Sequence, residues 1–514
     1  MLRRIRIAVA CLFFVGISLL FVDGSGTAPS YLSFLASWQF LPALRAGSFI
    51  SLGVLLLVTL LFGRVYCSTL CPLGVLQDII GRLGKKTRFR FSPAKKKLRW
   101  IVFAVFVLSL VAHLPLVFGL LEPFSAFGRI ASSLLAPVWA TGSNALAYVS
   151  ESTGSFAIGK TPIWLKGIST IAAAVLTLVV IGLLAWKYGR TWCNTICPVG
   201  TLLGLISRVS AFRPSVSAST CTSCQRCERG CKASCIDSKT KTVDCSRCVG
   251  CFNCLDFCKN KSLAIRFAWN FQGNKKNTKQ DSDANPKPDA PNAIGKGRRA
   301  AIATALGAGL VSMTAQAKTQ DGNEPDLSRR KPVKRGTQIT PPGSWHGRHY
   351  QAHCTGCQLC VAACPNQVLR ASDAGLGMFQ PTLSFERGYC RTNCVQCSTV
   401  CPTGAIRRIS VQDRTQIQVG IAAIQHDLCA ITADNIQCNA CFRVCPTNAI
   451  TMEDSGQKEN NDKKENSDKN DNSDKKRPVV NLDRCIGCGA CEYVCPVRPA
   501  SAIRVEGNLL HKRL

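Results

Sequence analysis

Residues 63–74 read GRVYCSTLCPLG, and residues 189–200 repeat them as GRTWCNTICPVG. Each copy follows a hydrophobic run and places two cysteines four positions apart, before a proline and a glycine. In each half of the repeat two hydrophobic runs precede the motif, so the chain is predicted to be a parallel tandem repeat. A pseudo-two-fold axis along a membrane normal would bring the two motifs together.

The four thiols of the two motifs then make one site. Cysteines at positions i and i+4 share a face of a helix, and the predicted ligands are Cys67, Cys71, Cys193 and Cys197. We predict a bound iron–sulfur cluster or other metal, with a redox dithiol and a purely structural pair of turns as the alternatives. The motif arginines, Arg64 and Arg190, either neutralise a negative cofactor or contact lipid headgroups, and the second role is favoured.

Four hydrophobic runs are long enough to span a bilayer, which requires about 20 mostly apolar residues. The first follows several arginines and is predicted to be a retained helix, with a signal peptide as the alternative. Lysine and arginine in the short loops place the N-terminus and residues 63–100 in the cytoplasm, and both motifs at the cytoplasmic end of a helix. The runs are 7–22, 46–62, 101–121 and 167–186.

The chain has 514 residues, a formal net charge of +33 and 31 cysteines. Almost every cysteine falls in a CxxC or CxxxCP unit, which favours metal ligation over a disulfide scaffold. A strongly basic chain suggests an anionic partner. Because the basic residues cluster beside apolar runs and in polar linkers, we expect that partner to be the lipid bilayer and not nucleic acid.

Residues 214–269 are predicted to form a ferredoxin domain with two 4Fe–4S clusters. In the unit CxxCxxCxxxC three thiolates bind one cubane, and the fourth reaches the other cluster of the pair. We therefore expect Cys231 and Cys258 to be exchanged between the two clusters. Cys235 and Cys245 are surplus, and we favour a role for them as small residues over ligation. The predicted ligands are Cys221, Cys224, Cys227, Cys231, Cys248, Cys251, Cys254 and Cys258.

Residues 340–510 carry four more sets of four cysteines, each ending in Cys-Pro, and are predicted to hold four cubanes. Zinc is the alternative, but zinc sites favour paired CxxC units separated by a spacer. The charged stretch 453–477 is predicted to be a disordered insertion. The predicted ligands are Cys354, Cys357, Cys360 and Cys364; Cys390, Cys394, Cys397 and Cys401; Cys429, Cys438, Cys441 and Cys445; and Cys485, Cys488, Cys491 and Cys495.

The segment between the two cysteine-rich regions has two parts. Residues 270–297 are polar and predicted to be a disordered linker. Arg298 and Arg299 then precede an alanine-rich, uncharged run at 300–317. We interpret 298–318 as an internal twin-arginine signal or anchor, with an ordinary linker helix as the alternative. The signal would carry the last domain, already folded, to the periplasm.

The predicted fold is an α-helical membrane domain over 1–213, with four transmembrane helices and a fifth left open at 300–317, joined to two α+β ferredoxin-like domains. The sequence contains no dinucleotide fingerprint, P-loop, haem-attachment motif or catalytic-triad signature. About six cubanes without any such motif indicate an electron carrier, whose chemistry belongs to its cofactors.

These motifs resemble two known families. Residues 1–266, with four apolar runs, two CxxxCP motifs and a double-cluster region, resemble NapH-type membrane quinol dehydrogenase subunits, and the NosR-like and CcoG-like families share this core. Residues 298–510, with twin arginine and then four cysteine groups, resemble NapG-type ferredoxins. The chain is therefore interpreted as a fusion of two proteins that are usually separate.

The resemblance implies oxidation of quinol from the membrane quinone pool and delivery of electrons to a periplasmic reductase or other redox protein. The chain would be a multi-pass protein of a bacterial inner membrane, with residues 187–297 in the cytoplasm and the C-terminal domain in the periplasm. Such an arrangement requires a cofactor near mid-membrane to join the two sides. A CcoG-like copper reductase that serves assembly of a respiratory complex, and a redox sensor, are the alternatives.

Overall fold

The computed structural model describes most of the chain: residues 1–23, 27–84, 89–154, 159, 161, 167–258, 260–269, 333, 335–373, 375, 377–454 and 476–514. The predicted linker, the twin-arginine segment with its candidate fifth span, and most of the predicted insertion lie outside the described residues. Contacts divide the chain into one unit of residues 1–268 and 330–514 and a second of 269–329. All elements below belong to the first unit.

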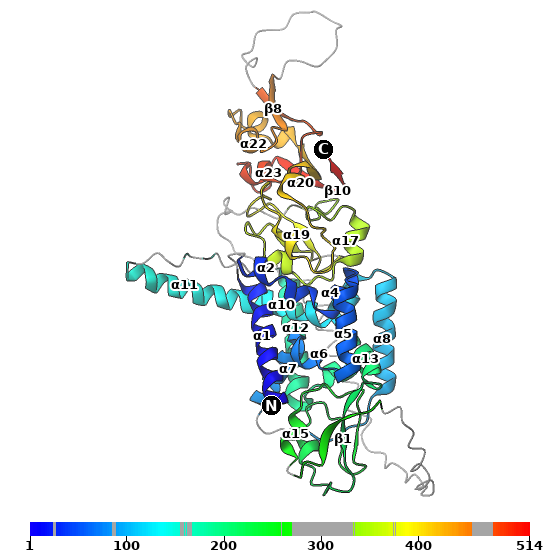
Figure 1. Ribbon diagram of the computed structural model, residues 1–514. Helices are drawn as coiled ribbons and strands as arrows, with labels where there is room; N and C mark the ends of the chain where they lie inside the picture. The colour runs from blue at the N-terminus through cyan, green and yellow to red at the C-terminus, as the bar shows by residue number, and fades with distance from the viewer. Residues whose placement is uncertain are drawn as a thin grey trace, which may run out of the picture. The chain divides into compact units, whose positions relative to one another are not determined.

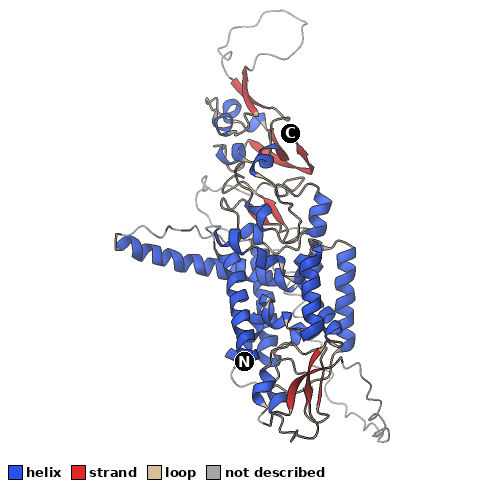
Figure 2. Cartoon of the chain, in the orientation of Figure 1, coloured by secondary structure: helices blue, strands red, loops and turns tan. Residues whose placement is uncertain are grey.

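The described residues among the first 210 are mostly helical, whereas the strands lie in the later part of the described chain (Figures 1 and 2). Two π-helical turns, η1 (Ala131–Leu135) and η2 (Trp192–Ile196), interrupt this part. Its helices are α1 (Leu2–Val22), α2 (Thr27–Leu32), α3 (Phe34–Ser37), α4 (Phe40–Arg45), α5 (Phe49–Phe62), α6 (Tyr66–Thr69), α7 (Pro72–Leu83), α8 (Lys96–Val111), α9 (Pro115–Leu121), α10 (Pro123–Ile130), α11 (Ala136–Ser152), α12 (Ile168–Tyr188) and α13 (Pro198–Ser207).

Two helices of the described chain, α1 and α12, are long and apolar enough to cross a membrane, and each has 21 residues. Helix α5 has only 14 residues. The run at 101–121 is not one helix, because α8 ends at Val111 and α9 begins at Pro115. Proline lacks an N–H and its ring clashes with the preceding turn, which explains the break. Helix length therefore does not support four membrane spans.

The two halves of the sequence repeat fold alike. Gly63 ends α5 with φ of 73°, and Gly189 ends α12 with φ of 63°, a conformation that favours glycine. A short helical turn with the first cysteine of the motif follows each glycine. Pro72 and Pro198 then begin α7 and α13, where a missing N–H leaves no hydrogen bond unmade.

The middle cysteine-rich region is an α+β unit built on two antiparallel strand pairs. Phe212 pairs with Phe267, so the region begins before residue 214, in the segment assigned to the helical domain. The cross-strand rings of these two residues pack edge to face. The elements are β1 (Phe212–Val216), α14 (Arg226–Arg229), β2 (Ile236–Asp237), β3 (Thr242–Val243), α15 (Asn253–Phe257) and β4 (Leu263–Phe267), with β1 beside β4 and β2 beside β3.

The C-terminal region consists of short helices and three antiparallel strand pairs, β5–β6, β7–β10 and β8–β9. The helical segments are α17 (Gly347–His353), α18 (Leu359–Ala362), α19 (Gln396–Val400), α20 (Val411–Gln416), η3 (His426–Leu428), α21 (Ala430–Ala433), α22 (Ala440–Val444) and α23 (Ala490–Val494). The strands are β5 (Leu369–Ala371), β6 (Pro381–Leu383), β7 (Ile417–Ile424), β8 (Ile450–Asp454), β9 (Lys476–Val480) and β10 (Ile503–Arg513).

The boundaries predicted for the insertion at 453–477 are wrong by two residues at each end. Glu453 pairs with Arg477 and Asp454 with Lys476 at the open end of the β8–β9 hairpin. Opposite charges on directly paired residues stabilise such a strand pair. The charged composition that suggested disorder therefore also continues into the strands.

Helix α1 contacts a different cysteine-rich region at each of its ends. Near its start, Arg3 forms a 2.6 Å ion pair with Asp256 of α15. Near its end, Phe21 lies beside Gly128, which closely approaches the carbonyl of Cys357 in the C-terminal region. A helix of 21 residues is about 31 Å long at 1.5 Å per residue. The middle and C-terminal regions therefore contact opposite ends of the helical part.

Candidate functional site

The two motifs bring their cysteines into one buried site. Cys67 lies in α6 and Cys193 in η2, while Cys71 and Cys197 are the N-cap residues of α7 and α13. Each of the four is 4–5% exposed. Their thiols lie close enough together that, besides burial, negative charge on the others contributes to raising the pKa of Cys71 and of Cys197. We call these residues the four-thiol site, and it contains the four cysteines that the sequence repeat predicts.

The arginine of each motif contacts the other copy. Arg64 donates from Nη2 to the carbonyl of Cys193 at 3.0 Å, and Arg190 donates from Nη1 to the carbonyl of Cys67. Both arginines are at most 1% exposed. The prediction that they contact lipid headgroups is therefore wrong: charges this far from solvent require partners inside the protein, and each finds its partner across the repeat.

The last glycine of each motif makes room for these arginines. A Cβ on Gly74 would lie 2.9 Å from Nη1 of Arg190, and a Cβ on Gly200 would lie 2.6 Å from Nη2 of Arg64. Both positions also closely approach the carbonyl of the first cysteine of their own motif. Any side chain at either glycine would therefore displace the contacts that join the two halves.

One carboxylate, Asp78 on α7, forms ion pairs with three cations beside the four-thiol site. Its Oδ2 lies 2.8 Å from Arg190, 2.9 Å from Lys232 and 3.2 Å from Arg6. Burial by itself would raise the pKa of Asp78, but the charges and hydrogen bonds of Arg190 and Lys232 lower it far below the usual value. Lys232 stands where many ferredoxin sets have proline, and here it provides an ion pair from the middle region to α7.

The donor set of the four-thiol site is four cysteines. A 4Fe–4S cubane uses such a set, with one thiolate at each of its four irons, and a single tetrahedral metal ion can use the same set.

The charge around the four-thiol site also fits a negatively charged group. Arg64 is fully buried. Its hydrogen bonds reach the side chain of Asn194 at 2.9 Å, two backbone carbonyls and, at 3.8 Å, the sulfur of Cys67. None of these partners is a carboxylate. A cluster held by four thiolates would supply the negative charge that this arginine lacks.

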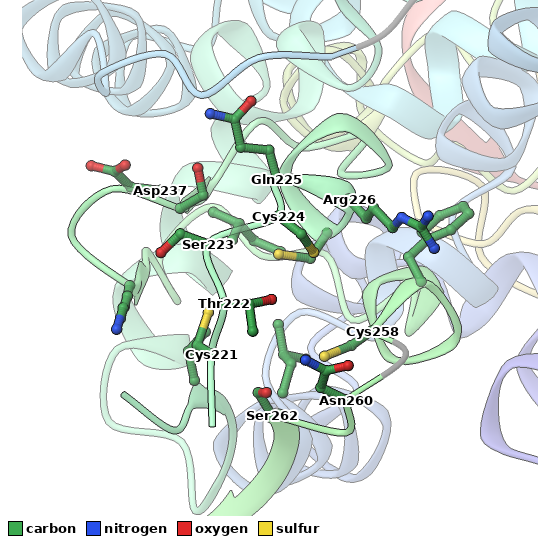
Figure 3. A pocket seen from close by; sticks show the side chains of 17 residues that line it. Cys221, Thr222, Ser223, Cys224, Gln225, Arg226, Asp237, Cys258, Asn260 and Ser262 are labelled. Atoms are coloured by element: carbon green, nitrogen blue, oxygen red, sulfur yellow. The ribbon is translucent and has the colours of Figure 1, made fainter. Parts of the chain in front are cut away.

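In the middle region, four cysteines from both predicted sets line one hollow of about 180 Å³. Figure 3 shows three of them, Cys221, Cys224 and Cys258, around this space. The fourth is Cys227. The structure therefore places Cys258 with the first set, which is the exchange that the CxxCxxCxxxC spacing predicts.

The other four predicted ligands of the middle region line a second hollow, about 240 Å³ in volume. Cys231 lines it together with three thiols of the second set, and the surplus Cys235 and Cys245 line it as well. The Sγ of Cys235 lies 3.5 Å from that of Cys231. A hydrogen bond from Cys235 lowers the pKa of Cys231. The remaining lining thiols are Cys248, Cys251 and Cys254.

The position of Cys235 could not be predicted from the sequence. Cys235 is 1% exposed and contacts a predicted ligand directly. Its position four residues after Cys231 is the only signal that the sequence gives, and that signal was outweighed by the regular spacing of the other eight cysteines. In the structure it provides a fifth thiol beside the second group.

In the C-terminal region each group of three thiols is joined by the last cysteine of a different set. In the first set Cys354 lies near Cys401, and in the second set Cys390 and Cys394 lie near Cys364. In the third set Cys441 lies near Cys495, and in the fourth set Cys485 lies near Cys445. The four groups are therefore Cys354, Cys357, Cys360 and Cys401; Cys390, Cys394, Cys397 and Cys364; Cys429, Cys438, Cys441 and Cys495; and Cys485, Cys488, Cys491 and Cys445.

These four groups do not follow one another in sequence order. The backbone N–H of Cys390 donates to the carbonyl of Cys488 at 2.9 Å, so the second group lies beside the one built on the fourth set. Cys441, of the third set, lies within electrostatic reach of Cys491. Cys360, of the first set, lies near Cys397 of the second, so the groups built on sets one, two, four and three follow one another in space.

Buried arginines accompany the C-terminal groups too. Arg414 is fully buried and donates from Nη2 to Cys390 Sγ at 3.3 Å. Arg129 of α10, equally buried, lies over the ring of Phe379 at 5.1 Å. Burial also raises the pKa of the Cys354 thiol to about 12, so a thiolate there requires a cationic partner such as iron.

Two families of iron–sulfur domains match the chain. A 4Fe-4S binding domain matches residues 44–90 and 169–217, which contain the four-thiol site and exclude the cysteine sets at 221–258. A 4Fe-4S dicluster domain matches residues 353–405 and 436–498. The sequence signal for cluster binding therefore covers both CxxxCP motifs and most of the C-terminal region.

Ferredoxin-type proteins are among the relatives. The methylamine utilization ferredoxin-type protein MauM of Methylorubrum extorquens is 33% identical over 175 residues, 32% of this chain and 71% of the relative. Ferredoxin-type protein NapG of Escherichia coli is 30% identical, over 33% and 71% respectively. The putative electron transport protein YccM of Escherichia coli is 28% identical over 42% of this chain and 55% of its own length. No solved structure matches the chain.

Proposed function

This chain belongs to the family of ferredoxin-type iron–sulfur proteins that includes NapG and MauM, and we propose that it carries electrons from membrane quinol to a periplasmic acceptor. In this proposal one chain unites a NapH-type membrane quinol dehydrogenase subunit with a NapG-type ferredoxin. The donor is the quinone pool of a bacterial inner membrane, and the acceptor is a periplasmic redox protein or reductase.

The observation that carries the proposal is the position of the four-thiol site between the two ferredoxin regions. On one side it adjoins the loop that bears Cys248 and Cys251. Arg64 donates to the carbonyl of Ser246 at 3.1 Å, and Ser68 donates to that of Gly250 at 3.4 Å. The second group of the middle region is thereby fixed against the motifs by direct hydrogen bonds.

On the other side, two buried side chains lie between the four-thiol site and the first C-terminal group. Tyr66 lies near Cys71 and Glu122, whose negative charges both act on its hydroxyl. Glu122 in turn lies near Cys357. Tyr66 is anchored by a 3.0 Å hydrogen bond from its hydroxyl to Gln39. This succession supports the four-thiol site as a cofactor that joins the two ferredoxin regions.

The protein's own contribution is to hold thiolates and offset their charge. A 4Fe–4S cluster bound at such a site takes up or releases one electron at a time. Buried arginines lie beside three of the thiol groups: Arg64 donates to the sulfur of Cys67 and Arg414 to that of Cys390, and Arg129 lies near Cys357. Because cationic side chains favour the more negative state of a neighbour at low dielectric, these arginines favour electron uptake at the groups they adjoin.

We propose that the two ends of the helical part face opposite sides of the membrane. Alkaline phosphatase, which needs oxidised disulfides, is expected to be active when fused after Leu514 and inactive when fused after Ala268. A fluorescent protein that folds only in the cytoplasm serves as the reciprocal reporter at both positions. A cytoplasmic signal from the fusion after Leu514 would refute export of the C-terminal region and, with it, delivery to a periplasmic acceptor.

A further inference from the structure

A cavity of about 290 Å³ lies between the start of α8 and the end of α13, and no cysteine lines it. Polar and basic side chains surround it, with one tryptophan. The lining residues are Ala94, Lys96, Arg99, Trp100, Thr201, Leu205, Arg208, Asp244 and Ser246. None of the predicted cluster ligands is among them, so the cavity is separate from the thiol groups described above.

The charge of this cavity is strongly positive. It is lined by three cations, Lys96, Arg99 and Arg208, and by one carboxylate, Asp244. The carboxylate is already engaged outside the cavity lining, because its Oδ2 accepts from Nε of Arg247 at 2.7 Å. Asp244 therefore also balances Arg247, which does not line the cavity, and the three lining cations outnumber the one lining carboxylate.

The hydrogen-bond partners of the Arg99 guanidinium carry no negative charge. Arg99 is 7% exposed, and its side chain donates to the hydroxyl of Thr201 at 3.3 Å, to Ser246 Oγ at 3.4 Å and to the carbonyl of Gly200 at 3.3 Å. All these partners are neutral. A buried guanidinium held only by neutral oxygens is expected to attract an anion into the adjacent space.

We propose that this cavity binds one phosphate group, supplied by an anionic phospholipid or by free inorganic phosphate. Arginine and lysine are the usual ligands of phosphate oxygens. Trp100, 48% exposed at the cavity, and the exposed Leu205 beside it suit the boundary between headgroups and acyl chains. The lipid as source rests on the proposed membrane location, whereas binding of a phosphate group does not.

The test uses the full chain purified in detergent, and it compares two double variants that each remove two positive charges. Lys96→Gln with Arg208→Gln changes two exposed lining residues, and Lys95→Gln with Lys97→Gln changes exposed neighbours outside the lining. Native mass spectrometry and thermal shift measure binding of phosphatidylglycerol, of diacylglycerol without phosphate, and of inorganic phosphate.

We expect the unaltered chain and the Lys95/Lys97 variant to bind one phosphatidylglycerol and to ignore diacylglycerol. The Lys96/Arg208 variant is expected to bind phosphatidylglycerol roughly thirty-fold more weakly. Competition by inorganic phosphate assigns the site to a phosphate from either source, and its failure to compete assigns the site to the lipid. Equal affinity of both double variants for phosphatidylglycerol, or equal binding of diacylglycerol, would overturn the proposal.

Discussion

A chain in which Cys67 and Cys193 are both replaced by serine is expected to lose quinol-driven reduction of its C-terminal region while the ferredoxin regions keep their iron. Each substitution removes one thiol from a different half of the repeat, so neither half supplies its pair. Both cysteines are buried, at 4% and 5% exposure, and a cubane requires four thiolates. The loss of iron should be roughly four atoms per chain.

Iron analysis and stopped-flow spectra after quinol addition measure these two effects. Cys11→Ser is the matched control, because Cys11 lies exposed on α1 and belongs to no thiol group. The control should keep both the iron content and the rate of reduction. Normal quinol turnover in the double variant would make the two motifs a structural pair of turns, and a loss of most of the iron would point to misfolding instead of a specific role.

Replacement of Asp78 by asparagine is expected to destabilise the chain by about 3–5 kcal/mol, the usual cost of removing one partner of a buried ion pair. The carboxylate serves three cations whose side chains are only 1–13% exposed. Without it, Arg6, Arg190 and Lys232 would stay buried near one another with no counter-ion at that point. The contact of the middle region with α7 should weaken first, because Lys232 provides its ion pair.

The midpoint of thermal loss of cluster absorbance reports this effect. Asp256→Asn is the matched control: it removes the same charge from an ion pair with Arg3 whose side chains are 36% and 49% exposed. Exposed ion pairs contribute about 0–1 kcal/mol, so this control should unfold close to the unaltered chain. Equal midpoints for the two variants would contradict the role of Asp78 as the anchor of the middle region.

Spacing along the chain predicted which cysteines would meet. The repeat of one motif after 126 residues placed Cys67 and Cys193 together, and the CxxCxxCxxxC unit placed Cys258 with the first set of the middle region. Both predictions follow from chain geometry, because a duplicated helix pair and a tight ligand loop constrain where their thiols can lie. The ferredoxin-type regions were predicted for the same reason.

What the sequence did not predict depends on contacts between distant segments. A basic residue beside an apolar run can face lipid or the protein interior, and Arg64 and Arg190 face the interior because each finds a carbonyl across the repeat. Pro115 lies inside an apolar run of ordinary appearance, yet the helix ends before it, at Val111, and a new helix begins at Pro115. The order of the C-terminal groups depends on the Cys390–Cys488 backbone contact, which no local spacing reveals.

The most direct test is the iron and acid-labile sulfide content of anaerobically purified protein, with spectra recorded during titration with quinol. Seven groups of four thiols predict roughly 28 iron and 28 sulfide per chain, four of each for every group. Quinol should reduce a part of these clusters at a potential within reach of the quinone pool. Fewer than about 16 iron atoms per chain, or no reduction by quinol at any attainable potential, would contradict the account.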